Sequence, residues 1–493
     1  MLFFMIEFVD FTEAIGILQV RSLSNYTASH AYEQLEFDFS APSYLLIPSA
    51  LPGFHNTDTK RYNSISGAVI YLMRGSQDIL PEDAVCASCG AAMHVHSNRE
   101  IVLSHLRFGK ALTQISVTRK RFFCPSCGAS HMQHIPYCSD HHRITKELEA
   151  YVCDLLALGT YTNKQVAELC GLHQHTVKAI DKRRLESLYV KDEKLVKPKH
   201  YARFLGIDEF KLHDGHQYAT HIIDMATGHV LWIAQGKKKK VVYDFIEHVG
   251  MDWMRHVDAV ALDMNSDFEE AFLEKCPHIR PVFDYFHLVK NFNDKVVSEV
   301  RKDEFKRLME EGKEEEARML KRSRYILTAN RETLARKDAE SAAGKVLHRE
   351  SKLFATPEKR RTGRYLSRYE ELIAKNRLFL TADLVKEALR EAYTCRNESD
   401  MIACLNTVLD LCSETKNRRF LWFYRLIQTH FDGIVAHGKF HIANGRMEGL
   451  NQKIKTMRRH AYGIADDEYL FLKIMDLSRA SYVRNPKSHK VLH

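Results

Sequence analysis

The segment FLGIDEFKL, at residues 204–212, has closely spaced apolar residues that predict a buried β-strand. The next segment, YATHIIDMATGHVLWIAQG at 218–236, predicts a hairpin that turns at Thr227 and Gly228. Strand and helix patterns then alternate, which together with the hairpin predicts a mixed sheet with helices packed on it, and so a multidomain α/β chain. The alternating segments are an amphipathic helix at 239–254, a strand at 257–265, a helix at 266–276, and a strand that continues into a helix at 279–292.

Acidic residues occur where these strands are expected to end. Asp208 is predicted to close the first strand, Asp263 ends a later one, and Asp284 ends the next, just before His287. A carboxylate at a strand end points into the crevice where ligands of open sheets bind. Each aspartate alone has a simpler explanation as a helix cap or a solvated turn, and Asp284 in particular could cap its helix.

Two such carboxylates brought together would repel each other unless a divalent cation neutralised them. Carboxylates that hold a pair of Mg²⁺ ions are the requirement of two-metal phosphoryl chemistry, in which the ions stabilise the attacking and leaving oxygens. We therefore look for a third acid further along the chain.

Residues 299–435 are dominated by charged helical sequence and predict a helical insertion without a catalytic pattern of its own. Its charge runs are interpreted as solvated faces, although KRRTGR at 359–364 could contact DNA. After the insertion, Asn444 and Gly445 predict a turn, and a helix that starts near Arg446 carries Glu448.

This last helix is strongly basic. Asn451, Lys455 and Arg459 lie near the same helical face as Glu448. An acid beside phosphate-binding groups is what chemistry on the DNA backbone needs. The alternative is a solvated helix in which Glu448 merely pairs with a neighbouring basic residue. The candidate DNA contacts on this helix are Lys453, Lys455, Arg458 and Arg459.

Two cysteine pairs of the same form, CASCG at 86–90 and CPSCG at 124–128, predict a structural zinc site. Two residues between thiolates let both point at one ion, and the glycine that follows suits the tight turn. Together the pairs complete a closed four-sulfur site; the alternative is buried or incidental cysteines. Cys138 and nearby histidines could hold a second ion, but surface histidines explain them as well. The predicted ligands are Cys86, Cys89, Cys124 and Cys127.

Residues 144–186 predict a helix-turn-helix. A helix that stops at Gly159 is followed by TNKQVAELCGLHQHTVKAIDKRRLE, in which Ala167 allows a close helix approach and Gly171 suits the turn. In this arrangement the second helix lies in the major groove of DNA. The alternative is a plain αα-hairpin. The candidate DNA contacts are His175, Lys178 and Arg184.

The composition of the whole chain fits a folded protein with a polyanionic partner. Its 493 residues include 72 Lys and Arg against 63 Asp and Glu, a net charge of +9. No apolar run reaches the roughly 18 residues that a membrane span needs. Residues 1–20 predict an amphipathic helix rather than a signal peptide, and residues 187–200 a charged linker. We expect a cytoplasmic protein without a membrane partner.

The motifs described above, including GIDEF, ALDMN, DYFHLVK and NGRMEGLNQKIKTMRRHAYG, occur in an order that resembles bacterial insertion-sequence transposases of the ISL3 family. The resemblance spans about residues 80–480. It implies an RNase H-like DDE catalytic domain that is interrupted by a helical insertion and preceded by a zinc ribbon and a helix-turn-helix. The expected domains are an N-terminal region of unknown role at 1–80, the zinc ribbon at 81–138, the helix-turn-helix at 140–190, the catalytic domain at 202–298 and 436–482, and the insertion at 299–435.

The same resemblance assigns roles to residues. Asp208, Asp263 and Glu448 match the DDE triad, which implies that they bind two Mg²⁺ or Mn²⁺ ions. Asp284 and His287 match the D-x-x-H motif that related transposases carry after the second acid. The implied partners are the terminal inverted repeats, target DNA and further copies of this chain. The alternatives are an inactive DNA-binding regulator and a metal-dependent nuclease without strand transfer.

Overall fold

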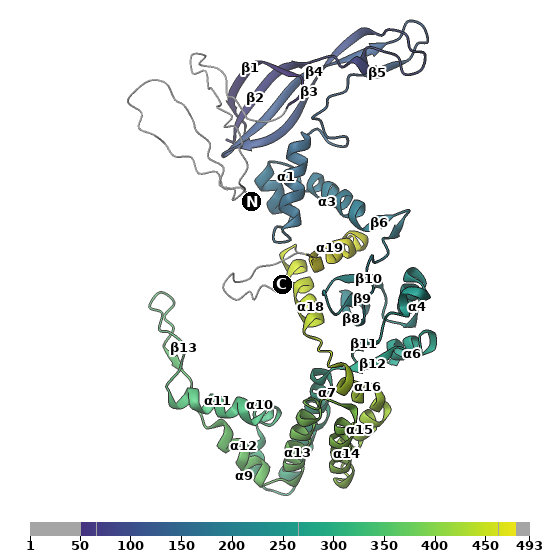
Figure 1. Cartoon of the computed structure of the whole chain (residues 1–493). Helices are drawn as coiled ribbons and strands as arrows, with labels where there is room; N and C mark the ends of the chain where they lie inside the picture. Colours follow the sequence, from purple (N-terminus) through teal and green to yellow (C-terminus); the bar gives the residue numbers. More distant parts are fainter. Residues whose placement is uncertain (1–50, 66, 265, 462, 480–493) are drawn as a thin grey trace, which may run out of the picture. The chain divides into compact units, whose positions relative to one another are not determined.

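The computed structural model describes residues 51–479 except 66, 265 and 462 (Figure 1). The chain divides into two compact units, Met1–Asp181 and Lys182–His493. The helix predicted for residues 1–20 lies outside the described residues. No helix in the described part of the chain is both long and apolar enough to cross a membrane.

The first unit is built on one sheet in the order β1-β2-β4-β3, with a short strand β5 added to β4. β3 and β4 form a long antiparallel hairpin, and β2 runs parallel to β4. Leu103, Ile115 and Val117 are fully buried on this sheet. Residues before position 80 therefore share a sheet with the strands between the two cysteine pairs. The strands are β1 (Phe54–Asn63), β2 (Val69–Gln77), β3 (His94–Phe108), β4 (Ala111–Phe123) and β5 (Ser130–Met132).

Three helices follow the sheet: α1 (Lys146–Ala157), α2 (Asn163–Cys170) and α3 (Gln174–Tyr189). Thr162 and Gln165 form a capping box that starts α2, which satisfies backbone groups at its first turn. Gly171 ends α2 in the left-handed conformation, at φ 69°, so the turn requires glycine as the sequence predicts.

The second unit contains a mixed sheet in the order β10-β9-β8-β11-β12. β10, β9 and β8 are antiparallel, whereas β8, β11 and β12 are parallel. The hairpin predicted at Thr227 and Gly228 is confirmed, with Gly228 at φ 78° between β9 and β10. The strands are β8 (Phe204–His213), β9 (Gln217–Asp224), β10 (Val230–Gln235), β11 (Ala259–Leu262) and β12 (Arg280–Phe283).

Helices cover both faces of this sheet. On one face α4 (Lys239–Val249) and α6 (Ser266–Lys275) pack against Leu205 and Ile207. The short helix α5 (Met251–Met254) follows α4 in the chain. On the other face α18 (Gly445–His460) and α19 (Asp467–Arg479) pack against Phe210 and Leu212. The alternation of buried residues along β8 thus serves two cores.

The segment 187–200 is not a plain linker. It contains the short hairpin of β6 (Val190–Lys191) and β7 (Lys194–Leu195). Asp192 and Glu193 both have positive φ at its turn, a backbone geometry that hairpin turns of two residues require.

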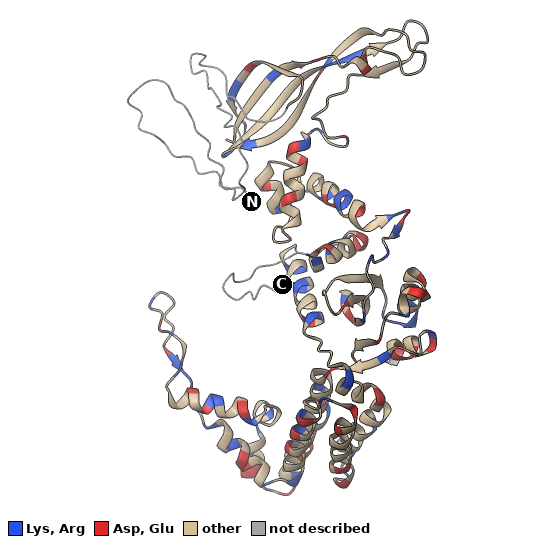
Figure 2. Cartoon of the chain, viewed as in Figure 1, with Lys and Arg blue, Asp and Glu red and all other residues tan. Residues whose placement is uncertain are grey.

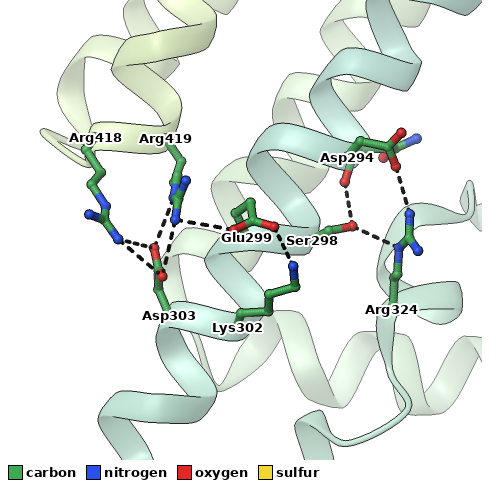
Figure 3. Close-up of polar contacts among 9 residues, drawn as sticks. Asp294, Ser298, Glu299, Lys302, Asp303, Arg324, Arg418 and Arg419 are labelled. Carbon is green, nitrogen blue, oxygen red and sulfur yellow. Dashed lines mark hydrogen bonds and ion pairs between the residues drawn. The ribbon is translucent and has the colours of Figure 1, made fainter. Parts of the chain in front are cut away.

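The segment 299–435 is mainly helical, as the sequence predicts. Its charge runs are not merely solvated faces, because Asp303 of α8 (Ser298–Glu310) forms ion pairs with Arg418 and Arg419 of α15 (Arg418–Thr429), as Figure 3 shows. The elements from the end of the sheet to α18 are α7 (Tyr285–Phe292), the π-helix η2 (Asn293–Val297), α8 (Ser298–Glu310), α9 (Glu314–Leu320), α10 (Arg324–Thr328), α11 (Arg331–Ala342), β13 (Val346–His348), β14 (Lys359–Arg360), α12 (Tyr365–Ala374), α13 (Arg377–Ala392), α14 (Glu398–Glu414), α15 (Arg418–Thr429), α16 (Phe431–Val435) and α17 (His437–Phe440).

Candidate functional site

Asp208 and Asp263 lie on neighbouring strands of the second sheet. Asp208 sits in the middle of β8, opposite His221 of β9. The prediction that Asp208 closes its strand is therefore wrong, since β8 continues to pair with β9 as far as His213. Asp263 follows β11 directly, as predicted. Because Ala261 of β11 pairs in parallel with Gly206 of β8, Asp263 comes level with Asp208.

A third carboxylate joins these two. One carboxylate oxygen from each of Asp208, Glu209 and Asp263 lies within 4.8 Å of the others. Glu209 is not among the residues predicted from the sequence. Neighbouring residues of a strand point to opposite faces, so the strand pattern alone predicts that Glu209 and Asp208 lie on different faces of the sheet. The adjacent acids in GIDEF were the available signal.

The electrostatics of this cluster suit a divalent cation. Burial raises the pKa of Asp208, and the charge of Asp263 raises it further. Burial also raises the pKa of Asp263. Desolvated carboxylates that face one another are stabilised when a hard cation binds their oxygens. The donor set is thus one that Mg²⁺ prefers.

Helix α18 packs on the face of β8 from which Asp208 projects. The side-chain amide of Asn451 donates a hydrogen bond of 2.7 Å to Oδ2 of Asp208. Gly206 permits this approach, because a Cβ there would lie 2.7 Å from the sulfur of Met447. Glu448 is exposed in the first turn of α18, three residues before Asn451 and so on a similar face.

Glu448 is not a member of the three-carboxylate cluster, but it lies close enough to Asp284 for its charge to raise the pKa of that residue. Burial is the larger cause of the raised pKa of Asp284. Oδ2 of Asp284 accepts a hydrogen bond of 3.1 Å from the backbone N–H of Phe286 and caps α7. The alternative that Asp284 caps its helix is therefore confirmed.

His287 links the two groups of acids. It lies in the first turn of α7, close enough to Asp208, Asp263 and Asp284 to lower the pKa of each, in each case against the larger opposing effect of burial. The structure therefore brings together the five residues that the sequence singled out, with three aspartates near His287 and Glu448 near Asp284. They are Asp208, Asp263, Asp284, His287 and Glu448.

The basic residues of α18 have different environments. Lys453, Lys455 and Arg459 are exposed, and Figure 2 shows the basic positions along this helix. Arg458 instead donates hydrogen bonds to the backbone carbonyls of Lys211 and Leu212. These hydrogen bonds hold α18 on the end of β8. The sequence had predicted that Arg458 contacts DNA.

The three residues of α3 that were predicted to contact DNA also differ in their exposure to solvent. His175 is exposed and Lys178 is partly exposed. Arg184 forms an ion pair of 2.8 Å with Asp476 of α19, and its side chain is only 13% exposed. The hydroxyl of Tyr189 donates to the same carboxylate. Arg184 is thus engaged within the second unit and not open to DNA.

The four cysteines of the first unit form one cluster, with one sulfur of each within 4.8 Å of the others. The Sγ atoms of Cys86 and Cys127 are 3.5 Å apart, and so are those of Cys89 and Cys124. A tetrahedron with Zn–S distances of about 2.3 Å has edges of roughly 3.8 Å. The residues therefore fit one structural zinc ion.

Local backbone geometry prepares each pair for the metal. Gly90 and Gly128 follow the pairs at φ 71° and 74°, where a side chain would be strained. Their N–H groups bond back to the carbonyls of Cys86 and Cys124 at 2.8 and 3.0 Å. Among the described residues, no metal-binding group of three or more side chains includes Cys138.

Comparison with known proteins identifies relatives of both units. The ISL3 DDE family model, described as a transposase, matches residues 205–474. A second model, the zinc-finger of transposase IS204/IS1001/IS1096/IS1165, matches residues 82–127. The transposase for insertion sequence element IS1001 of Bordetella parapertussis is 27% identical over 404 residues, which cover 82% of this chain and 90% of that protein. The transposase for IS1557 of Mycobacterium tuberculosis is 24% identical over 425 residues, covering 80% and 87%.

Proposed function

The chain belongs to the ISL3 family of insertion-sequence transposases, and from this we propose that it binds the terminal inverted repeats of its element and catalyses Mg²⁺-dependent DNA cleavage and strand transfer. One observation carries the proposal. Two desolvated aspartates on adjacent strands, Asp208 and Asp263, meet beneath a basic helix that carries Glu448 and is bonded to Asp208 through Asn451.

The catalytic domain that we propose is RNase H-like. The strand order β10-β9-β8-β11-β12, with three antiparallel strands followed by two parallel ones, supports this assignment. The position of one acid on the central strand and of another directly after its parallel neighbour supports it further. The helical insertion then separates α18 from this sheet in the sequence.

Asp208 and Asp263 would hold one Mg²⁺ ion, with Glu209 as a further oxygen donor, and Glu448 would complete a second site. When bound, Mg²⁺ supplies positive charge that stabilises the attacking and leaving oxygens of a phosphodiester. Asn451 holds the carboxylate of Asp208 in place through its hydrogen bond. His287 adds a donor beside the acids that orients the scissile phosphate.

The residues of this chain act mainly by position and charge. The exposed Lys453, Lys455 and Arg459 bind phosphates of the DNA backbone next to the acids. The attacking groups are water in cleavage and then the 3′-OH of the released end in strand transfer, and both are aligned in the same site.

The DNA-binding modules are the zinc ribbon and the helix-turn-helix of α2 and α3. The capping box of α2 and the left-handed Gly171 support this assignment, since they build the tight turn between the two helices. His175 and Lys178 lie on α3, where the second helix of such a motif meets DNA. Because two element ends must be joined, we also propose that at least two copies of the chain act together in the cytoplasm.

The proposal is tested with purified full-length protein, Mg²⁺ and a duplex that carries the inverted repeats flanking its gene. Glu448→Gln is compared with Glu468→Gln, which changes a glutamate with an 88% exposed side chain on α19. We expect cleavage at the repeat tip by the unmodified protein and by Glu468→Gln, followed by joining to target DNA, and no cleavage by Glu448→Gln.

Three results would contradict parts of this proposal. Specific binding without cleavage by the unmodified protein would identify a regulator. Nicked products that are never joined would identify a nuclease. Equal cleavage by Glu448→Gln would remove that residue from the catalytic site.

A further inference from the structure

A cavity of about 550 Å³ opens beside helix α7, within the second unit. Its volume lies in the range of sites that hold small organic groups. Residues of α7, of η2, of α10 and of the segment leading into α10 line it. Those that matter for its chemistry are Phe286, Val289, Lys290, Arg322, Arg324 and Tyr325.

Two of these residues are exposed aromatic rings. Phe286 is 54% exposed and Tyr325 is 48% exposed, although both side chains have apolar faces that could have been buried. The ring of Phe286 also packs edge-on against the ring of His287, with centroids 5.7 Å apart. Lys337 holds its ammonium group 3.9 Å from the centroid of Tyr325. The cavity is thus an aromatic site directly beside the catalytic histidine.

Cations complete the lining. Arg324 is fixed by hydrogen bonds of 2.8 Å to Asp294 and 3.1 Å to the hydroxyl of Ser298, as Figure 3 shows. In contrast, neither Lys290 nor Arg322 takes part in an ion pair with any residue that the structure describes. Asp294 also lines the cavity, but its carboxylate is paired with Arg324, so Lys290 and Arg322 remain as two cations outside ion pairs. Such cations beside exposed rings favour a ligand that has both a flat π-system and negative charge.

Lys290 connects the cavity to the acids. Its side chain lines the cavity, and the next residue, Asn291, places its side-chain amide 3.9 Å from the sulfur of Met264, which directly follows Asp263. A DNA strand whose phosphodiester lies at Asp263 would therefore pass Lys290 within one or two nucleotides. At that point its bases are beside Phe286 and Tyr325.

We propose that this cavity holds an unstacked nucleobase of the DNA strand that is cleaved at Asp208 and Asp263, with its phosphate on Lys290 or Arg322. The inference rests on the proposed function, since it needs DNA at the acids. An aromatic side chain that stacks on a displaced base offsets the energy of unstacking it from the duplex. The cavity would thereby hold the strand in a fixed position during cleavage.

The test measures single-turnover cleavage by the full-length protein with Mg²⁺. The substrates are repeat-end duplexes in which each nucleotide near the cleavage site is replaced in turn by an abasic one. We expect one abasic position to slow cleavage about tenfold, the effect of losing one base–aromatic stack. Phe286→Ala should slow cleavage of the intact duplex by a similar factor, and the abasic position should then slow it no further.

Three further variants separate stacking from folding. Phe286→Leu retains an apolar side chain for folding but cannot stack, so it should behave like Phe286→Ala, while Phe286→Tyr should restore base dependence. Trp422→Ala removes another exposed aromatic ring, 39% exposed on α15, and should cleave like the unmodified protein on every substrate.

Base dependence that is equal in the unmodified protein and in Phe286→Leu would overturn the inference. So would cleavage by the unmodified protein that no abasic position slows, and in both cases the proposed function would stand. Absence of cleavage by the unmodified protein on every duplex would instead overturn the proposed function, and this inference with it.

Discussion

The side-chain amide of Asn451 donates a hydrogen bond of 2.7 Å to the carboxylate of Asp208, and so joins α18 to the central strand of the second sheet. Glu448 lies three residues earlier on the same helix. The bond therefore sets the position of the third proposed acid relative to the first. Asn451 acts as a positioning residue through Asp208.

Removing this hydrogen bond should slow cleavage without weakening DNA binding. We expect Asn451→Ala to lower the cleavage rate about tenfold, because a hydrogen bond to a charged group contributes roughly 1.5–3 kcal/mol. Asn451→Gln should recover part of the rate, and Gln452→Ala, at the exposed next position, should change nothing. Rates and repeat affinity are measured together. A loss of affinity equal to the loss of rate would contradict a positioning role.

Replacing Asp263 with asparagine should abolish cleavage and yet stabilise the metal-free protein. Burial raises the pKa of Asp263, so the folded state resists its ionisation. The free energy of unfolding accordingly falls as pH rises from the ordinary aspartate pKa of 3.8 to the raised value. At pH 7 we expect Asp263→Asn to gain about 1 kcal/mol.

The same experiment tests the metal. Thermal unfolding is recorded with and without Mg²⁺ for the unmodified protein, Asp263→Asn, and Asp252→Asn, whose side chain is 93% exposed. Mg²⁺ should raise the melting temperature of the first and third proteins only. An equal rise in Asp263→Asn would show that Mg²⁺ binds elsewhere.

Zinc content should depend on one cluster of cysteines. We expect one zinc ion per chain by atomic absorption, lost in Cys124→Ser, because a structural site needs all four thiolates. Cys138→Ser should retain the ion, since Cys138 does not belong to the cluster. A chelator should unfold the first unit, seen as lost β-sheet signal. Two zinc ions per chain would instead indicate a second site near Cys138.

The first unit should lose stability in mild acid through His105. This histidine is 1% exposed, and burial lowers its pKa to about 4. A histidine with a lowered pKa stabilises the fold above its unfolded pKa of about 6.5, and this contribution is lost as pH falls toward 4. The loss amounts to up to about 3 kcal/mol.

His105→Asn should flatten this dependence, whereas His96→Asn, at an exposed position of the same strand, should leave it unchanged. The free energy of unfolding is measured by urea titration between pH 4 and 7.5. An unchanged slope in His105→Asn would assign the acid sensitivity to another group.

Replacing Lys455 and replacing Arg184, which were both predicted to contact DNA, should have different effects. Lys455→Ala should weaken DNA binding and reduce the slope of log affinity against log salt by about 1, as expected for one phosphate contact. Arg184→Ala should leave that slope unchanged and lower the free energy of unfolding by about 2 kcal/mol, because the partly buried Asp476 keeps its hydrogen bond from Tyr189 but loses its ion-pair partner. A reduced salt slope in Arg184→Ala would contradict its structural role.

The features that the sequence analysis predicted well depend on neighbouring residues. The cysteine pairs, the left-handed Gly171 and the hairpin turn at Gly228 each follow from a few adjacent side chains and from the freedom of glycine at positive φ. The mixed sheet follows from the order of local patterns, and Asp263 and Asp284 were placed correctly because each comes directly after a short parallel strand.

Other outcomes depended on contacts between distant segments. Asp208 lies inside its strand because β9 extends the pairing beyond it. Arg184 and Arg458 read as DNA contacts in sequence, where positive charge is visible but its partners are not. In the folded chain, Asp476 and the carbonyl of Lys211 engage them.

Local sequence is thus sufficient for the cysteine pairs, the turns and the acids other than Glu209, since these are set by side-chain chemistry and short-range backbone geometry. The meeting of those acids is not local. Asn451 reaches Asp208 across 243 residues, past a helical insertion, because apolar residues of α18 are buried against β8. Burial of that helix, and the desolvation of the carboxylates beneath it, arise only when the whole second unit has folded.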